Sequence, residues 1–380
     1  MQIRQINSIN EVTAADWNQW VEPGYPFIRH EFLQALEQSG AVSTETGWQV
    51  SHLLLYQNHE LLAILPLYRK QHSQGEYVFD QQWAAAYHQY GLAYYPKLLT
   101  AIPFTPSQGQ RVLIKPTCDN QAVISYFLSH IQQLAEHTHV SSWHCLFPAE
   151  QQFDQLRLAG LTIRQGVQFH WFNQSYQSFD DFLQSLTASK RKMLKRERRR
   201  VADEGIHLDS IEGKDITDEQ WQVFFRFYVL TYQKKGAYAY LNLAFFRQIA
   251  ASMAEQLLLV LAVKDGQYIA AALSFVGSDC LYGRYWGCEE DYSGLHFETC
   301  YYQGIDYCIK QGLQRFDSGA QGEHKIARGF QPVTTYSAHW LKDERFAQVI
   351  ADFVGREQQM LADYKQDAST YLPFKCKSQN

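Results

Sequence analysis

The chain has 380 residues, of which 46% are hydrophobic and 15% aromatic, so it can bury a large core and exceeds the usual length of a single-core domain. Its formal net charge of -5 excludes a global attraction to nucleic acid or to an anionic membrane. Seven scattered cysteines without a C-x-x-C pair, a polar first segment and the lack of any membrane-length apolar run predict a soluble, cytoplasmic protein.

Two predicted β-hairpins have the same form. Residues 52–70 contain two apolar runs around the polar letters QNHE, and residues 257–277 contain two apolar runs around KDGQ. The glycine–leucine pairs that begin at Gly91 and Gly294 are separated by nearly the same length of chain as the two hairpins. This equal spacing predicts a duplicated unit.

The boundary between the two copies is expected between residues 161 and 178, which gives domains at residues 1–165 and 166–380. In the second copy, strands and helices follow one another in an order that indicates a central mixed sheet flanked by helices, an α/β (α+β) fold. The predicted elements are at residues 206–211, 219–235, 243–256, 257–277, 280–288, 297–312, 315–317 and 336–341.

Residues 179–202 carry the strongest local charge. Ser178, with Asp181 three residues on, predicts a capped helix start, and apolar residues recur at helical spacing, so we expect one amphipathic helix. Eight basic residues and one acidic residue lie between Lys190 and Arg200. Because these cations repel one another, a partner with phosphate groups would relieve the repulsion. A solvated helix face is the alternative. The residues expected to bind phosphate are Lys190, Arg191, Lys195, Arg196 and Arg199.

Residues 318–340 concentrate titratable side chains between glycines, after the predicted strand at 315–317. Glycines permit tight bends there, and such a loop at a sheet edge often faces a binding cleft. A histidine suits proton transfer near neutral pH, and a carboxylate can orient it. We therefore predict that His324 accepts a proton, with Glu323 orienting it. A surface loop with a local Glu–Arg pair is the alternative.

The same region supplies further candidates. Lys325 and Arg328 are expected to steer an anionic group, and Tyr336 or His339 to line the acyl site, although His339 is equally consistent with a satisfied core histidine. Arg284 is a candidate for the lining of the cleft. No metal site is expected, because His137, His139, His144 and Cys145 match no standard zinc spacing. P-loop, Rossmann and G-x-S-x-G motifs are absent from the sequence.

Four of these stretches together resemble the bacterial FemAB-like family of N-acyltransferases, in the GNAT superfamily. They are FLQALEQSGAVSTETGWQVSHLLL, QYGLAYYPKLLTAIPFTP, FDDFLQSLTASKRKMLKRERRRV and GEHKIARGFQPVTTYSAHW. The resemblance runs over nearly the whole chain and implies two tandem GNAT-like acyltransferase folds. It also implies a link to peptidoglycan, since related Fem-type transferases move an aminoacyl group from charged tRNA to a peptidoglycan precursor that carries UDP.

One departure from the GNAT pattern concerns the donor. A GNAT that uses coenzyme A holds the pyrophosphate with a glycine-rich loop at a helix start. Here the equivalent loop, EEDYSGLHFE, places Glu289, Glu290 and Asp291 beside its only glycine, and these carboxylates would repel a pyrophosphate. The loop assigned to the first copy, HQYGLAYYPK, lacks the glycine pattern too. The identity of the co-substrate that donates the acyl group stays open: acyl-CoA and aminoacyl-tRNA are both candidates. No tightly bound cofactor is expected.

The leading prediction is an N-acyltransferase that forms an amide bond on an amine acceptor, for which a peptidoglycan precursor is a candidate. Two alternatives stay open. One is a non-catalytic recognition module for a phosphorylated cell-wall precursor or RNA. The other is an acyltransferase for a lipid amine, whose basic helix would contact anionic headgroups with about 1 kcal/mol per cation. The expected partners are a small-molecule or phosphorylated precursor, tRNA and a peripheral membrane surface.

Overall fold

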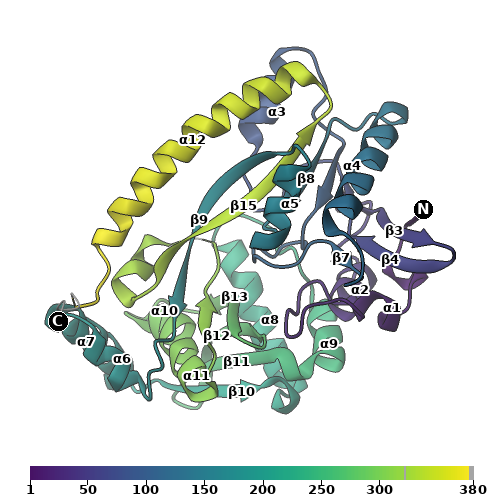
Figure 1. Cartoon of the computed structure of the whole chain (residues 1–380). Helices are drawn as coiled ribbons and strands as arrows, with labels where there is room; N and C mark the ends of the chain where they lie inside the picture. Colours follow the sequence, from purple (N-terminus) through teal and green to yellow (C-terminus); the bar gives the residue numbers. More distant parts are fainter. Residues whose placement is uncertain (321, 376–380) are drawn as a thin grey trace. The chain divides into compact units, whose positions relative to one another are not determined.

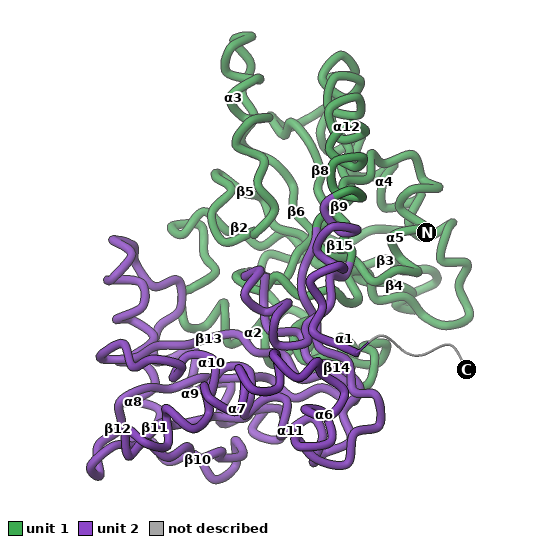
Figure 2. Tube along the Cα trace, turned by 90° about the vertical axis from the view of Figure 1, so that its left-hand side faces the viewer, with its two compact units in different colours: residues 1–166, 334–363 green, residues 167–333, 364–380 purple. Residues whose placement is uncertain are grey.

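The computed structural model describes residues 1–320 and 322–375, and the chain forms two compact units (Figures 1 and 2). The first unit contains Met1–Gly166 and Thr334–Asp363, and the second contains Val167–Val333 and the chain from Tyr364 onward. Residues 334–363 therefore belong to the first unit, whereas the sequence places them in the C-terminal domain. The difference places Tyr336 and His339 in the first unit and His324 in the second.

The first unit contains two groups of strands. The first group is an antiparallel sheet in the order β1-β3-β4-β7, and it includes the hairpin predicted at residues 52–70. In the second group, with the order β15-β8-β6-β5-β2, β6 and β8 are parallel. The strands are β1 (Gln2–Ile6), β2 (Trp48–Val50), β3 (His52–Gln57), β4 (Glu60–Leu65), β5 (Tyr68–Lys70), β6 (Lys97–Thr100), β7 (Leu113–Ile114), β8 (Ser142–Leu146) and β15 (Gln331–Leu341).

Six helices accompany these strands: α1 (Ala14–Asn18), α2 (His30–Gln38), α3 (Gln81–Gln89), α4 (Asn120–His137), α5 (Glu150–Leu158) and α12 (Glu344–Thr370). The Asp119 side chain caps α4 by accepting from the backbone N–H groups of Gln121 and Ala122. The face of α4 that carries Phe127 and Ile131 is buried against the apolar residues of β3 and β4. This packing holds α4 beside the first sheet.

The second unit contains the strand order β10-β11-β12-β13-β14-β9. The hairpin predicted at residues 257–277 is present as β11 and β12, which pair in antiparallel fashion. β13 and β14 pair in parallel over only three residues, Cys280–Tyr282 with Arg315–Asp317, and β13 then continues to Cys288. The strands are β9 (Thr162–Phe172, from Val167 in this unit), β10 (His207–Glu212), β11 (Leu257–Lys264), β12 (Gln267–Val276), β13 (Cys280–Cys288) and β14 (Arg315–Asp317).

The prediction of one helix over residues 179–202 is wrong, because two helices occupy this stretch: α6 (Phe179–Ser185) and α7 (Ala188–Asp203). Ser178 caps the first of them as predicted. Leu186 is fully buried in an extended conformation and pairs with Phe374, while the Thr187 N–H donates to the Pro373 carbonyl. This pairing with a distant segment interrupts a helical pattern that is continuous in the local sequence.

The other helices of the second unit are α8 (Asp218–Gln233), α9 (Leu243–Ser252), α10 (Leu295–Phe297) and α11 (Gln303–Gln311), with a π-helical turn at Glu298–Tyr302 between the last two. The proposed match of Gly91 with Gly294 is wrong. Gly91 follows α3 and leads to strand β6, whereas Gly294 begins α10. In the second unit Gly294 lies between the parallel strands β13 and β14. In the first unit the parallel strands are β6 and β8, with α4 between them, and Gly91 lies before β6. The two glycines therefore occupy different places relative to the parallel strands.

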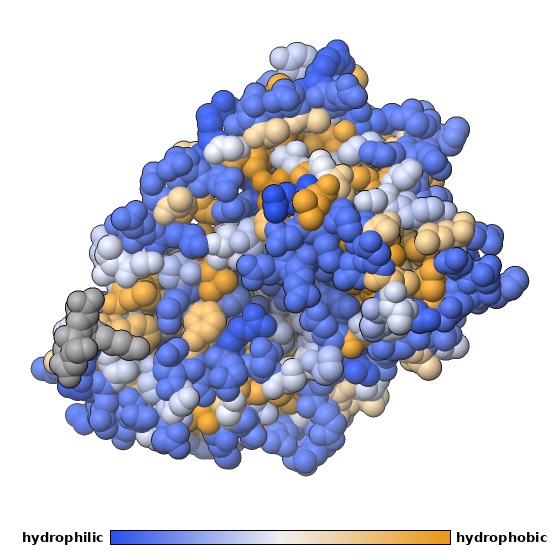
Figure 3. Space-filling model, in the orientation of Figure 1, coloured by the Kyte–Doolittle hydropathy of each residue, from blue (hydrophilic) through white to orange (hydrophobic). Residues whose placement is uncertain are grey.

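The surface face drawn in Figure 3 is mainly hydrophilic, with its hydrophobic residues in separate groups. Within the described part of the chain, no helix combines the length and the apolar character needed to cross a bilayer.

Candidate active site

The candidate active site lies in the second unit, where β13 and β14 separate. Asp317 ends β14, and its carboxylate accepts from Arg284 on β13, with Nη2 2.6 Å from Oδ2 and Nη1 3.2 Å from Oδ1. His170 on β9 lies 3.7 Å from the same carboxylate. Burial lowers the pKa of His170 to about 4 despite Asp317, so this imidazole is neutral. Arg284 holds the pKa of Asp317 well below its usual range against the effect of burial.

The loop after β14 is anchored by Lys325. Its buried ammonium donates to the carbonyls of Ser318 (3.0 Å) and Gly319 (2.8 Å), and the Gly319 N–H donates to Asp317. Burial lowers the pKa of Lys325 to about 8, with Asp317 acting in the opposite direction. Gly319 and Gly322 have φ values of 88° and 116°, which favour glycine. These contacts fix the bend that precedes the 3₁₀ turn at Glu323–Arg328.

His324 is exposed on this turn, and Tyr301 is its hydrogen-bond partner: the Tyr301 hydroxyl and His324 Nε2 lie 2.8 Å apart. Burial, together with Lys325 and Arg328, lowers the pKa of His324, so its imidazole is neutral near pH 7. Burial raises the pKa of Tyr301, so its hydroxyl stays protonated. A neutral imidazole on an accessible turn, held by a phenol, can accept a proton from a bound amine.

A cavity of about 260 Å³ adjoins this histidine through His296. The ring centroids of His296 and His324 are 6.0 Å apart, and those of His296 and Trp286 are 5.3 Å apart. Burial lowers the pKa of His296 to about 4. The lining also includes Glu290 and Asp291, from the loop before α10. The cavity therefore combines aromatic walls with two carboxylates.

The π-helical turn after α10 sets the positions of several of these groups. Such turns often occur at functional sites. It directs Tyr301 toward His324, and Tyr302 toward Glu197 of α7. Glu197 also accepts from Arg328 Nη2 at 2.7 Å, and the Arg328 guanidinium lies 3.4 Å from the Phe297 ring centroid. One helix, one π turn and the loop that carries His324 are thereby joined.

The exposed face of α7 carries Lys192, Lys195, Arg196 and Arg199, at i, i+3, i+4 and i+7; we call these four residues the basic stripe. Lys195 makes an exposed ion pair with Asp180 at 3.3 Å. Among the described residues, none makes an ion pair or hydrogen bond with the other three side chains. Near the end of α7, Arg200 Nη1 lies 3.4 Å from Ser293 Oγ, in the loop that borders the cavity.

The structure separates the predicted phosphate-binding residues into two sets. Lys195, Arg196 and Arg199 are exposed on the basic stripe, which Lys192, absent from the prediction, completes. Lys190 and Arg191 are partly buried beside it. Arg198, on the inner side of α7, pairs with Glu298 and Asp306, each at 3.0 Å.

Three side chains that were predicted to contact a ligand have partners within the protein. Lys325 is bound to two loop carbonyls, Arg284 to Asp317, and Arg328 to Glu197 and the His324 carbonyl. These contacts fix the three side chains within the protein, and their binding of an anionic ligand stays a prediction. Glu323 does not orient His324, because its carboxylate accepts from the Tyr364 hydroxyl at 2.8 Å.

Tyr336 and His339 belong to the first unit, and neither is among the described residues that line the cavity near His324. The Tyr336 ring stacks on Phe153 with centroids 4.0 Å apart. His339 is buried, with Nδ1 2.7 Å from His144 Nδ1 and Nε2 2.8 Å from Ser337 Oγ. Burial lowers both histidine pKa values well below the ordinary value, so this pair belongs to a neutral polar network of the core.

Several residues of the site were missed by sequence reasoning, namely His170, His296, Asp317 and Glu197. Asp317 ends a predicted strand immediately before a glycine-containing loop, which is a usable signal. The roles of His170 and Glu197 depend on contacts between distant segments, which local sequence does not reveal. Among the residues that the structure describes, no group of three or more His, Cys, Asp or Glu side chains is placed to hold a metal ion.

Comparison with solved structures shows the fold. The chain is similar to FemX, with 10% identity and a TM-score of 0.53 over 92% of this chain and 100% of FemX. It is similar to the C-terminal domain of a putative lysylphosphatidylglycerol synthetase from Agrobacterium fabrum, with 10% identity and a TM-score of 0.52 over 86% and 90% of the two chains. A protein of unknown function from Bacteroides thetaiotaomicron matches with 9% identity and a TM-score of 0.50, over 89% and 99%.

The protein thus has a mixed α/β fold similar to that of FemX, and the predicted α/β class is confirmed. A family profile described as FemAB-like, peptidoglycan biosynthesis and recognition, matches residues 8–376. The chain belongs to the FemAB-like family, and the predicted resemblance is confirmed. No curated protein matches the sequence.

Proposed function

We propose that this protein is an N-acyltransferase that moves an acyl or aminoacyl group to the amine of a peptidoglycan precursor. The observation that carries the proposal is the neutral His324 on its anchored loop, bonded to Tyr301 of the π-helical turn, beside the cavity of Trp286, Glu290 and Asp291. Membership of the FemAB-like family supports the cell-wall context.

The reaction needs a base and a bound amine. The amine nitrogen attacks the acyl carbon, a C–N bond forms, and the N–H proton passes to His324 Nδ1, while the Nε2–H group of the imidazole donates to the Tyr301 hydroxyl oxygen. The bond from the acyl carbon to the oxygen or sulfur of the donor then breaks, and the leaving group takes the proton. Carboxylates at the cavity, with an aromatic wall, attract the cationic form of an amine and raise its local concentration; the ammonium group loses one proton to solvent before its nitrogen can attack.

Two features favour aminoacyl-tRNA over acyl-CoA as donor. Glu290 and Asp291 are exposed in the loop before α10, where they oppose a pyrophosphate; of the three acids in this loop, Glu289 alone forms an ion pair with a described residue, Arg226 at 3.6 Å. The basic stripe supplies phosphate contacts on an extended helix face, and α7 reaches this loop through Arg200 and Ser293. A stripe of this kind suits a nucleic-acid backbone.

The occupied side chains of Lys325, Arg328 and Arg284 favour a second candidate, a recognition module without turnover. The test is an incubation with each donor class and a UDP-linked peptidoglycan precursor, followed by mass spectrometry of the precursor. An acyltransferase yields a precursor with a new amide. Salt-dependent binding without a new amide, under conditions that preserve the fold, would establish the recognition module instead.

A further inference from the structure

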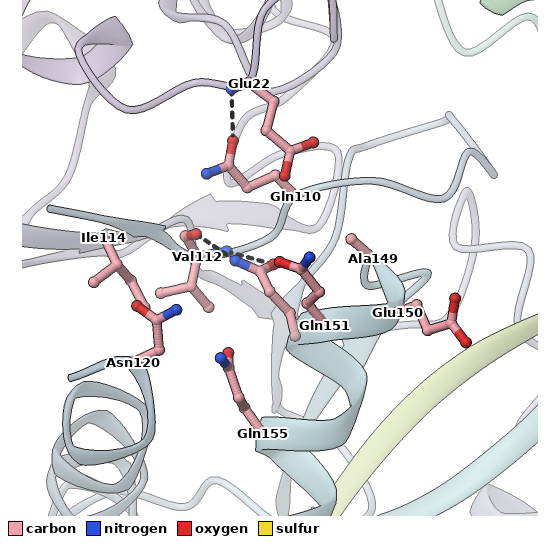
Figure 4. A pocket seen from close by; sticks show the side chains of 10 residues that line it. Glu22, Gln110, Val112, Ile114, Asn120, Ala149, Glu150, Gln151 and Gln155 are labelled. Atoms are coloured by element: carbon pink, nitrogen blue, oxygen red, sulfur yellow. Dashed lines mark hydrogen bonds between the residues drawn. The ribbon is translucent and has the colours of Figure 1, made fainter. Parts of the chain in front are cut away.

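A second cavity, of about 380 Å³, lies in the first unit where β7 meets the starts of α4 and α5 (Figure 4). None of the described residues that line it is a lysine, arginine or histidine. Glu22 and Glu150 contribute carboxylates, and the other polar lining is made of amides: Gln110, Asn120, Gln151, Gln152 and Gln155. Such a lining disfavours phosphates and other anions, and it suits a neutral or cationic ligand rich in amide groups.

Gln152 pairs with the strand edge in the way that a peptide group would. Its Nε2 donates to the Val112 carbonyl at 2.6 Å, and its Oε1 accepts from the Val112 N–H at 3.2 Å and from the Arg111 N–H at 2.6 Å. The side chain thus occupies the position of a neighbouring strand, but only beside residues 111 and 112.

The same edge continues past Gln152 at Ile114. On its other side β7 pairs with β4, with Leu113 opposite Ile64, and the Lys115 N–H donates to the Leu62 carbonyl. In an antiparallel ladder alternate residues bond to opposite sides. Because Leu113 and Lys115 face β4, the N–H and C=O groups of Ile114 face the same side as those of Val112. Among the described residues, no other strand or loop bonds to these two groups, which leaves them open to a further strand.

Side-chain amides surround this edge. Asn120 and Gln155 both point into the cavity (Figure 4). Gln155 Oε1 is buried, and the described residues provide it with no hydrogen-bond partner. Buried acceptors are usually satisfied, so this oxygen indicates a missing donor. Ala149, at the start of α5, also provides no side-chain cap for the first N–H groups of that helix.

We propose that this cavity binds an extended peptide segment, uncharged or positively charged, that adds as a strand to the open edge of β7. The peptide pairs with the Ile114 backbone, and its next amide groups meet Gln155 and Asn120. Strand addition draws affinity from main-chain hydrogen bonds, which matches a lining with few apolar groups. The two carboxylates select against acidic peptides. The proposal concerns binding alone and does not rest on the transfer reaction.

The test uses acetyl-penta-alanine amide as the probe, the same peptide N-methylated at every residue, and a neutral trisaccharide. Hydrogen exchange at the Ile114 amide and NMR shifts of the Gln155 side chain report binding to the full chain. The unmethylated peptide should slow exchange at Ile114, and the N-methylated peptide should not. Gln155→Leu should weaken binding about fivefold, as the loss of one net hydrogen bond predicts.

The matched control is Gln133→Leu, on the exposed face of α4, which should leave binding unchanged. Thermal unfolding of both variants checks that each is folded. Equal binding of the N-methylated peptide would overturn strand addition. Preference for the trisaccharide, or unchanged Ile114 exchange at millimolar peptide, would overturn the peptide assignment.

Discussion

The contact between Glu197 and Arg328 gives the sharpest prediction about stability. Their side chains are 16% and 7% exposed, and Glu197 also accepts from the Tyr302 hydroxyl. Glu197→Ala leaves the Arg328 guanidinium buried against Phe297 without its carboxylate. Breaking a buried pair from one side costs roughly 3–5 kcal/mol, and the partial exposure of Glu197 places the expected loss near about 3 kcal/mol.

The matched control is Glu204→Ala, one residue beyond α7. Glu204 is 57% exposed and pairs with Lys264 at 3.3 Å. Its removal should cost less than about 1 kcal/mol, as for other surface pairs. Urea unfolding measures both values. Because a chain of two units can unfold in more than one step, hydrogen exchange of second-unit amides is measured alongside urea unfolding to show which unit is destabilised. Equal losses from the two substitutions would refute the role given to Glu197.

Three further predictions concern other parts of the molecule. Lys325 has a pKa of about 8, below its unfolded value of about 10.4, so the unfolded chain keeps the Lys325 proton in this range and the contribution of Lys325 to stability should rise from pH 8 to pH 10; in denaturant titrations, the free energy of unfolding of the wild type minus that of Lys325→Met should increase between these two pH values. Neutralising Lys192, Arg196 and Arg199 to glutamine should reduce the salt slope of tRNA binding by roughly two to three, whereas the same change at Lys214, Lys235 and Lys310 should not. Gly287→Ala should lower the thermal midpoint strongly, since the new Cβ would lie 2.0 Å from the Phe227 carbonyl, while Gly355→Ala, which meets open space, should not.

Sequence reasoning succeeded where the signal is local. The two hairpins are marked by apolar runs around short polar turns, and both are present. The basic residues of α7 and the exposed His324 could also be located from sequence, because charge and glycine punctuation are read directly from the letters. The FemAB-like family followed from longer motifs.

The failures have a common physical cause, which is contact between distant segments. Leu186 breaks the predicted helix because residues near the C-terminal end pair with it. Lys325 and Arg328 look like ligand-binding cations in sequence, but the fold supplies two carbonyls to one and Glu197 to the other. His339 is paired with His144, almost two hundred residues away. Such partners are set by the tertiary fold and leave no local pattern.

The most direct test of the proposed function is the single-turnover rate of amide formation, measured by mass spectrometry for the wild type, His324→Gln and His207→Gln. His207 is an exposed histidine of β10 in the same unit and serves as the matched control. We expect amide product from the wild type, a loss of about 100-fold or more in His324→Gln, in line with general base catalysis, and an unchanged rate in His207→Gln. Equal rates for His324→Gln and the wild type would contradict the assignment of His324 as the proton acceptor.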